Sequence, residues 1–160
     1  IQCTPKKTQC NSCMMIESCF AFRNKKVSEL PIKTKKTKIK DRYFSYFIIK
    51  DAFDNVIIEQ RSEKDIWQGL YQFPMIEERS SHSSHNAKKH IMKYISDENY
   101  QIKLLNDTPI RHKLSHQLLH LSFYECNVIS LKKKSIQWND ALNLPFPIVI
   151  WNFLQSYYAK

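Results

Sequence analysis

The sequence has 160 residues, enough for one domain with a substantial core and shorter appended segments. It is strongly basic, with 25 Lys and Arg against 15 Asp and Glu, so we expect a polyanionic partner, nucleic acid before membrane. No stretch is apolar enough to span a membrane, and the first residues do not resemble a signal peptide. The single glycine, Gly69, excludes a P-loop and a dinucleotide-binding fingerprint.

Four of the five cysteines lie near the start of the chain, with six, two and five residues between successive members. Four thiolates are what a closed tetrahedral metal site or an iron–sulfur cluster requires. Structural zinc, disulfides and a cluster are therefore the three interpretations. Only one pair is closely spaced, unlike the two short pairs of common zinc sites, and disulfide-stabilised domains are usually richer in cysteine. The four cysteines are Cys3, Cys10, Cys13 and Cys19.

The complete six-two-five spacing resembles the cysteine loop of the endonuclease III and MutY DNA glycosylases. This resemblance implies that the four cysteines bind a 4Fe-4S cluster, and that residues 1–22 form the end of a catalytic domain. It also implies that Lys6 and Lys7 lie near DNA phosphates; solvated lysines are the alternative. Because the chain has no initiator methionine, we expect it to be the C-terminal part of a longer protein.

A basic linker is predicted over residues 23–41. Residues 23–42 contain nine basic and two acidic residues, and they show no amphipathic period. Such a segment stays extended, repels itself and can follow a phosphate backbone. An ordinary charged tether is the alternative. The lysines that we expect to contact DNA phosphates here are Lys33, Lys35 and Lys36.

A folded domain is predicted over residues 42–160. Residues 43–49 are rich in aromatic and β-branched side chains and are apolar on both faces, which predicts a central strand buried on both sides. The polar residues within 51–55 predict a turn, and residues 56–58 predict the returning strand of a hairpin.

Residues 66–74 contain the motif Trp-x-Gly-Leu-x-x-Phe-Pro, which resembles the core of the Nudix fold and, in particular, the Nudix-like C-terminal domain of MutY. The resemblance implies an α+β fold, Nudix-like or MutT-like, with a mixed β-sheet packed between helices. Nudix hydrolases bind magnesium through carboxylates on the following helix. Residues 87–95 keep a helical pattern but have no carboxylate, and Glu77 and Glu78 precede them. We therefore predict the fold without magnesium or pyrophosphohydrolase activity. The face predicted to be buried comprises Ala87, Ile91, Tyr94 and Ile95.

The next segments predict further strands. Residues 102–105 predict a short strand, and residues 110–126 predict one long strand or two joined strands. The alternation within the second segment places Leu119, Leu121 and Phe123 on one face.

Inside this region, residues 112–116 (His-Lys-Leu-Ser-His) resemble the lesion-recognition loop of MutY, which contacts 8-oxoguanine. Ser115 and His116 match the family motif, and Leu114 stands where several relatives have Phe. 8-Oxoguanine differs from guanine by an N7–H donor and an O8 atom. A hydroxyl can both donate and accept at that edge, and contacts to a base edge confer specificity. A Ser–His pair facing solvent from a strand is the alternative.

The remaining predictions concern packing. Cys126 is expected to be a small buried hydrophobe, and Pro147 is placed to begin the last helix. His82, His85 and His90 are expected in a solvated loop and on an exposed helix face rather than at a metal site. The buried stripe expected for the last helix comprises Ile148, Trp151, Leu154 and Tyr158.

The resemblance covers nearly the whole chain, which is identified as the C-terminal part of a MutY-type adenine DNA glycosylase of base excision repair. That family removes adenine mispaired with 8-oxoguanine after flipping it out of the stack. The resemblance implies that double-stranded DNA with this mispair is a partner and that an N-terminal helical catalytic domain belongs to the same chain. It also implies a monomer in the bacterial cytoplasm, associated with the nucleoid and not with a membrane. The family's catalytic residues and much of the cluster's surroundings lie upstream, so we predict no catalytic residue and no base removal by this chain alone. A stand-alone Nudix pyrophosphohydrolase with a metal-binding tail and a zinc-binding nucleic-acid adaptor are the alternatives.

Overall fold

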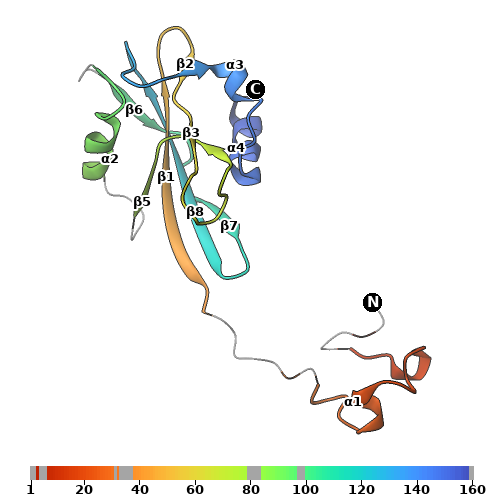
Figure 1. Cartoon of the computed structure of the whole chain (residues 1–160). Helices are drawn as coiled ribbons and strands as arrows, with labels where there is room; N and C mark the ends of the chain where they lie inside the picture. The colour runs from red at the N-terminus through yellow and green to blue at the C-terminus, as the bar shows by residue number, and fades with distance from the viewer. Residues whose placement is uncertain are drawn as a thin grey trace. The chain divides into compact units, whose positions relative to one another are not determined.

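The computed structural model describes residues 3, 7–30, 32, 38–78, 84–96 and 100–158, with the backbone alone at 84–86. The chain divides into two compact units, Ile1–Lys38 and Ile39–Lys160 (Figure 1). The smaller unit contains a 3₁₀ helix, η1 (Cys10–Ser12), and one short α-helix, α1 (Phe20–Arg23). The expected division into a cysteine loop, a linker and a folded domain stays a prediction.

The larger unit is built on a mixed sheet with helices on both faces, as the predicted α+β fold requires (Figure 1). Seven strands form one sheet in the order β6-β8-β1-β2-β9, with β5 paired to β1 and β7 paired to β8, while β3 and β4 form a small second sheet. No helix in the described ranges is long and apolar enough to cross a membrane. The strands are β1 (Lys40–Lys50), β2 (Asn55–Val56), β3 (Glu59–Gln60), β4 (Tyr71–Gln72), β5 (Met75–Glu78), β6 (Gln101–Leu104), β7 (Ile110–Lys113), β8 (Gln117–Asn127) and β9 (Ile136–Gln137). The helices are α2 (Ser84–Ile91), α3 (Trp138–Ala141) and α4 (Ile148–Tyr158).

Strand β1 is the centre of the main sheet. It pairs in parallel with the whole of β8, from Lys40 opposite Gln117 to Lys50 opposite Asn127, and antiparallel with β5 and β2. Apolar side chains at successive positions suit a strand covered on both faces, so the predicted central strand is confirmed. It begins at Lys40, before the expected domain start at residue 42, because the backbone pairing with β8 reaches that far.

The two faces of β1 pack against different helices because side chains alternate along a strand. Phe44, Tyr46 and Ile48 belong to the core layer that includes α4, whereas Phe47 and Ile49 belong to the layer that includes α2. As predicted, β8 adds three fully buried side chains to the α4 layer, Leu119, Leu121 and Phe123.

Helix α4 buries Leu154 and packs Tyr158 against the core as predicted, but Ile148 and Trp151 do not lie on the buried face. Ile148 is 59% exposed and Trp151 is only half-buried. The segment is apolar around most of its circumference, so its periodicity fits more than one face. The ring of Phe153 stacks on that of Phe123 with centroids 3.8 Å apart, and this contact with β8 orients the helix. The buried residues of α4 are Val149, Ile150, Phe153 and Leu154.

The opposite layer confirms the burial predicted for the face of α2 and for Cys126, although the helix ends at Ile91 and does not continue to residue 95. Cys126 is fully buried, and burial raises the pKa of its thiol to about 12, so the thiol stays neutral. Ala87 is half-buried at the margin of this layer. The fully buried side chains at the end of α2 and just beyond it are Ile91, Tyr94 and Ile95.

His90 is half-buried rather than exposed, contrary to the prediction. Its ring centroid lies 5.9 Å from that of Phe47 and 5.2 Å from that of Tyr94, because α2 ends at the next residue and the following turn lies over the sheet. Its Nε2 atom is buried without a hydrogen-bond partner in the described part of the chain. His82 and the side chain of His85 lie outside the described residues.

Candidate nucleic-acid interface

Strands β7 and β8 form a hairpin with a tight turn. The backbone N–H of Leu114 donates to the carbonyl oxygen of Gln117 over 2.8 Å, which leaves Ser115 and His116 at the tip. Both side chains are exposed. The segment is therefore two joined strands, and the Ser–His pair lies in the turn between them rather than within a strand.

The tip is held from two sides. The carbonyl oxygen of His116 accepts a hydrogen bond from the backbone N–H of Lys40, at the start of β1, over 3.0 Å. The side chain of Leu114 is half-buried and packs against the α4 core layer. Leu114 therefore supports the turn from below, while Ser115 and His116 project from it.

The hairpin is basic on one face. Arg111 and Lys113 are both exposed and, being two residues apart on β7, lie on the same face. His112 lies on the other face, with its ring centroid 5.9 Å from that of Trp67. The exposed Lys40 follows at the start of the neighbouring β1, so positive charge is available beside the tip.

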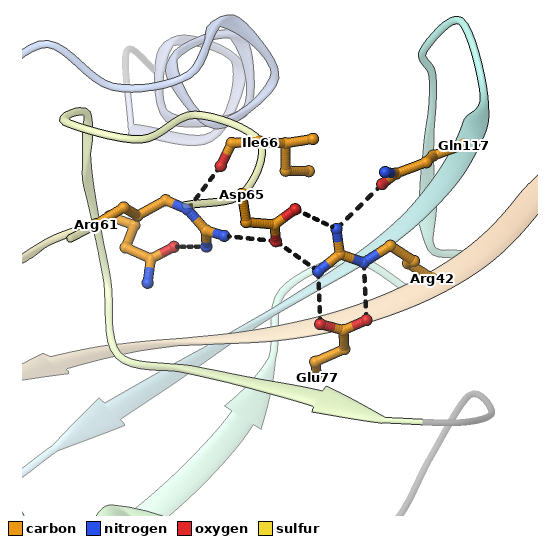
Figure 2. A network of polar contacts seen from close by, with 7 residues as sticks. Arg42, Arg61, Asp65, Ile66, Glu77 and Gln117 are labelled. Atoms are coloured by element: carbon orange, nitrogen blue, oxygen red, sulfur yellow. Dashed lines mark hydrogen bonds and ion pairs between the residues drawn. The ribbon is translucent and has the colours of Figure 1, made fainter. Parts of the chain in front are cut away.

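A buried arginine on β1 connects the tip end of this hairpin, at Gln117, to the rest of the domain (Figure 2). Arg42 is 9% exposed. Its Nε and Nη2 atoms donate to the two carboxylate oxygens of Glu77 over 2.7 and 2.6 Å. Its Nη1 and Nη2 atoms donate to those of Asp65 over 3.0 and 2.7 Å. Nη1 also donates to the side-chain oxygen of Gln117 over 3.0 Å, so four segments of the domain meet at one guanidinium.

A second buried arginine extends the network. Arg61 donates to the side-chain oxygen of Gln72 over 2.7 Å and to the backbone oxygen of Ile66 over 3.0 Å. It also donates to Asp65 over 3.2 Å, so the two arginines share one carboxylate. A polar cavity of about 300 Å³ borders both arginines.

The network keeps its carboxylates ionised. Hydrogen bonds from Arg42 lower the pKa of Glu77 and that of Asp65 below their ordinary values, against the opposing effect of burial. The same contacts raise the pKa of Arg42. Sequence analysis missed this network; the available signal was an arginine directly before the largely apolar run of residues 43–49.

The smaller unit brings the four predicted cluster ligands together. Cys3, Cys10, Cys13 and Cys19 all line one cavity of about 290 Å³, together with apolar side chains. The N–H of Cys13 donates to the carbonyl oxygen of Cys10 over 3.0 Å, which turns the chain between the two. No cysteine among the described residues is in a disulfide.

This donor set fits a group with four thiolate ligands. A four-iron cluster distributes its cysteines over separate irons, and apolar surroundings are typical of such sites. In the described ranges, no three His, Cys, Asp or Glu side chains are arranged to hold a single metal ion. The cofactor therefore stays a prediction that rests on the ligand set.

The structure describes only one of the five lysines that we predicted to contact DNA. Lys7 is exposed, but Lys6, Lys33, Lys35 and Lys36 lie outside the described residues.

Among the described residues, the carboxylates near the expected magnesium position of the Nudix fold are few. Both carboxylate oxygens of Glu77 accept hydrogen bonds from Arg42. Helix α2 has no Asp or Glu in its sequence. The prediction that this domain binds no magnesium remains to be tested.

The large unit is a mixed sheet with helices on both faces, and its strands β4 and β5 precede the short helix α2. This arrangement is the architecture of the MutT-like α+β proteins. The chain belongs to the NUDIX domain family, whose sequence pattern matches residues 45–156.

Similar proteins agree with this assignment. An adenine DNA glycosylase of Buchnera aphidicola subsp. Schizaphis graminum is 32% identical over 158 residues, which cover 91% of this chain but 43% of that protein. The chain thus spans less than half the length of this relative. Among solved structures, the C-terminal domain of mouse MUTYH, in a complex with human PCNA, has a TM-score of 0.61 at 14% identity, over 74% of this chain and 88% of that one. The MutT protein from Methanosarcina mazei Go1 has a TM-score of 0.54 at 10% identity, over 76% and 95%. These two likenesses concern the fold.

Proposed function

We propose that this chain is the C-terminal part of an adenine DNA glycosylase that removes adenine mispaired with 8-oxoguanine. The observation that carries the proposal is the 32% identity to the Buchnera glycosylase, because it covers 91% of the chain and therefore both of its units. The large unit reads the 8-oxoguanine base, and the small unit binds a cluster and DNA.

The tip of the β7–β8 hairpin is the lesion-reading element. Ser115 and His116 are exposed on a turn that is fixed to β1 through Lys40. The Ser115 hydroxyl accepts from the N7–H of 8-oxoguanine or donates to O8. Arg111 and Lys113 contribute phosphate contacts that hold the duplex without reading its sequence.

The small unit holds a 4Fe-4S cluster through Cys3, Cys10, Cys13 and Cys19. The cluster's role is structural and DNA-sensing, with Lys7 near the phosphates. The linker lysines follow the DNA backbone. A zinc-bound form would make this unit a general nucleic-acid adaptor instead.

Base removal belongs to an N-terminal helical domain of the same protein, which flips the adenine out of the duplex. This chain contributes recognition and no catalytic group. It acts as a monomer in the bacterial cytoplasm, at the nucleoid. A stand-alone pyrophosphohydrolase is the less favoured function, because Glu77 is paired with Arg42 and α2 has no carboxylate. Release of pyrophosphate from 8-oxo-dGTP in the presence of magnesium would support that alternative.

Binding to two duplexes tests the proposal. One duplex carries 8-oxoguanine opposite adenine, and the other carries guanine at the same position. We expect tighter binding to the oxidised duplex at equal salt concentration, since the phosphate contacts are common to both. Equal affinities for the two duplexes would refute lesion reading by this chain.

A further inference from the structure

Gln117 lies beside the tip of the lesion-reading hairpin, directly after His116 at the start of β8. Its Oε1 atom accepts a hydrogen bond from Arg42 over 3.0 Å (Figure 2). A guanidinium can only donate, so the amide oxygen must be the atom that faces Arg42. The amide nitrogen therefore faces away from the network.

The orientation of this amide is fixed by its surroundings. Arg42 is itself held by the four hydrogen bonds that it donates to Glu77 and Asp65, and it is almost completely buried. The Nε2 atom of Gln117 has no hydrogen-bond partner among the residues that the structure describes. Gln117 is half-buried, so part of its side chain reaches the surface beside the tip.

The chemistry of this amide matches the oxidised base. Its two N–H groups can only donate, and 8-oxoguanine offers a carbonyl oxygen, O8, where guanine has a C8–H group. Guanine would leave an oriented donor unpaired, which costs binding free energy. The donor also complements the Ser115 hydroxyl, which can accept from the neighbouring N7–H.

On the basis of the proposed function, we propose that Gln117 is a third lesion-reading side chain, whose Nε2–H donates to O8 of 8-oxoguanine. Arg42 is the positioning residue that orients this amide. Both residues lie outside the Leu-Ser-His motif.

Two variants separate this role from simple anchoring of the hairpin. Gln117→Glu keeps an oxygen that accepts from Arg42 but has no N–H donor. Gln117→Met has a similar length and no polar atom. Gln101→Glu is the matched control, because Gln101 is exposed on β6 and pairs with Asn127 at the other end of β8. It introduces the same charge far from the tip.

The measurement is the ratio of dissociation constants for the 8-oxoguanine and guanine duplexes, because general charge effects cancel in this ratio. We expect both Gln117 variants to reduce the preference for 8-oxoguanine about tenfold, the worth of one hydrogen bond. The Gln101→Glu control should keep the preference. A preference that survives in both Gln117 variants would overturn the inference while leaving the proposed function intact. If the unsubstituted chain has no preference, the proposed function itself is overturned.

The positioning role of Arg42 has its own readout. Arg42→Lys keeps the charge but cannot make the forked contacts, so it should lower the preference partially. In combination with Gln117→Met it should lower the preference no further, because both changes act through one donor. Additive effects of the two substitutions would exclude this role for Arg42.

Discussion

The backbone amide of Lys40 donates to the carbonyl oxygen of His116 over 3.0 Å, and this bond joins the first residue of the central strand to the tip of the β7–β8 hairpin. The two residues are distant in sequence, and the parallel pairing of β1 with β8 brings them together. The exposed Ser–His turn is thus bonded directly to β1, the central strand of the sheet.

Removal of this bond should loosen the tip. Lys40→Pro has no N–H and is tolerated at the first residue of a strand, so we expect a loss of about 1 kcal/mol in the free energy of unfolding. Hydrogen exchange at the Leu114 amide, which closes the turn, should become faster. Lys40→Ala keeps the N–H and should leave the exchange rate unchanged. Equal exchange rates in the two variants would show that this bond does not hold the tip.

The Arg42 network should be a large contributor to stability. Arg42→Met would leave the carboxylates of Asp65 and Glu77 without their main partner, and we expect a loss of about 3 kcal/mol in urea unfolding. Arg111→Met is the matched control, since Arg111 is exposed, and should change stability by less than about 0.5 kcal/mol. Similar losses for the two variants would contradict the assigned importance of the network.

His90 should make the domain less stable in mild acid. Burial, and then the nearby charge of Lys93, lower the pKa of His90 below its ordinary value of 6.5. The unfolded chain therefore takes up a proton first, so this stability is complete above about pH 6.5 and declines as the pH falls below it. His90→Phe should flatten the pH dependence of the unfolding free energy between pH 7 and 5. His116→Asn, at an exposed position, should not. An unchanged profile in His90→Phe would mean that His90 is free to ionise in the folded state.

The cysteine cavity should bind iron and sulfide. We expect chain that is purified without oxygen to contain acid-labile sulfide and iron, and we expect each of Cys10→Ala and Cys13→Ala to abolish both. Cys126→Ala is the control, because Cys126 is buried in the other unit and should leave the iron content unchanged. Stoichiometric zinc without sulfide would replace the cluster with a structural zinc site.

The sequence predicts the layers of this fold well because they depend on local alternation. The apolar run in β1 and the buried positions Leu119, Leu121 and Phe123 of β8 follow from side-chain period alone. The orientation of α4 does not, since Ile148 and Trp151 are as apolar as the residues that are buried. The contact of Phe153 with Phe123 decides between the two faces, and it joins segments distant in sequence.

The candidate site likewise contains some residues that the sequence predicts and others that it does not. Ser115 and His116 can be recognised from a short motif, whereas Arg42 and Gln117 cannot, because their contact depends on the register between β1 and β8. Asp65 and Glu77 likewise gain their partners only when the loop before Ile66 and strand β5 meet β1. The residues of such a buried polar network do not recur at a fixed interval along the sequence, so no periodic pattern predicts them.

The most direct test of the central claim is the effect of Ser115→Ala on the preference for a duplex with 8-oxoguanine opposite adenine over one with guanine at that position. Ser130→Ala is the control, because Ser130 is exposed beyond the other end of β8. If the hairpin tip reads the lesion, the unsubstituted chain and Ser130→Ala prefer the oxidised duplex, and Ser115→Ala loses most of that preference. An undiminished preference in Ser115→Ala would place lesion reading elsewhere and contradict the account.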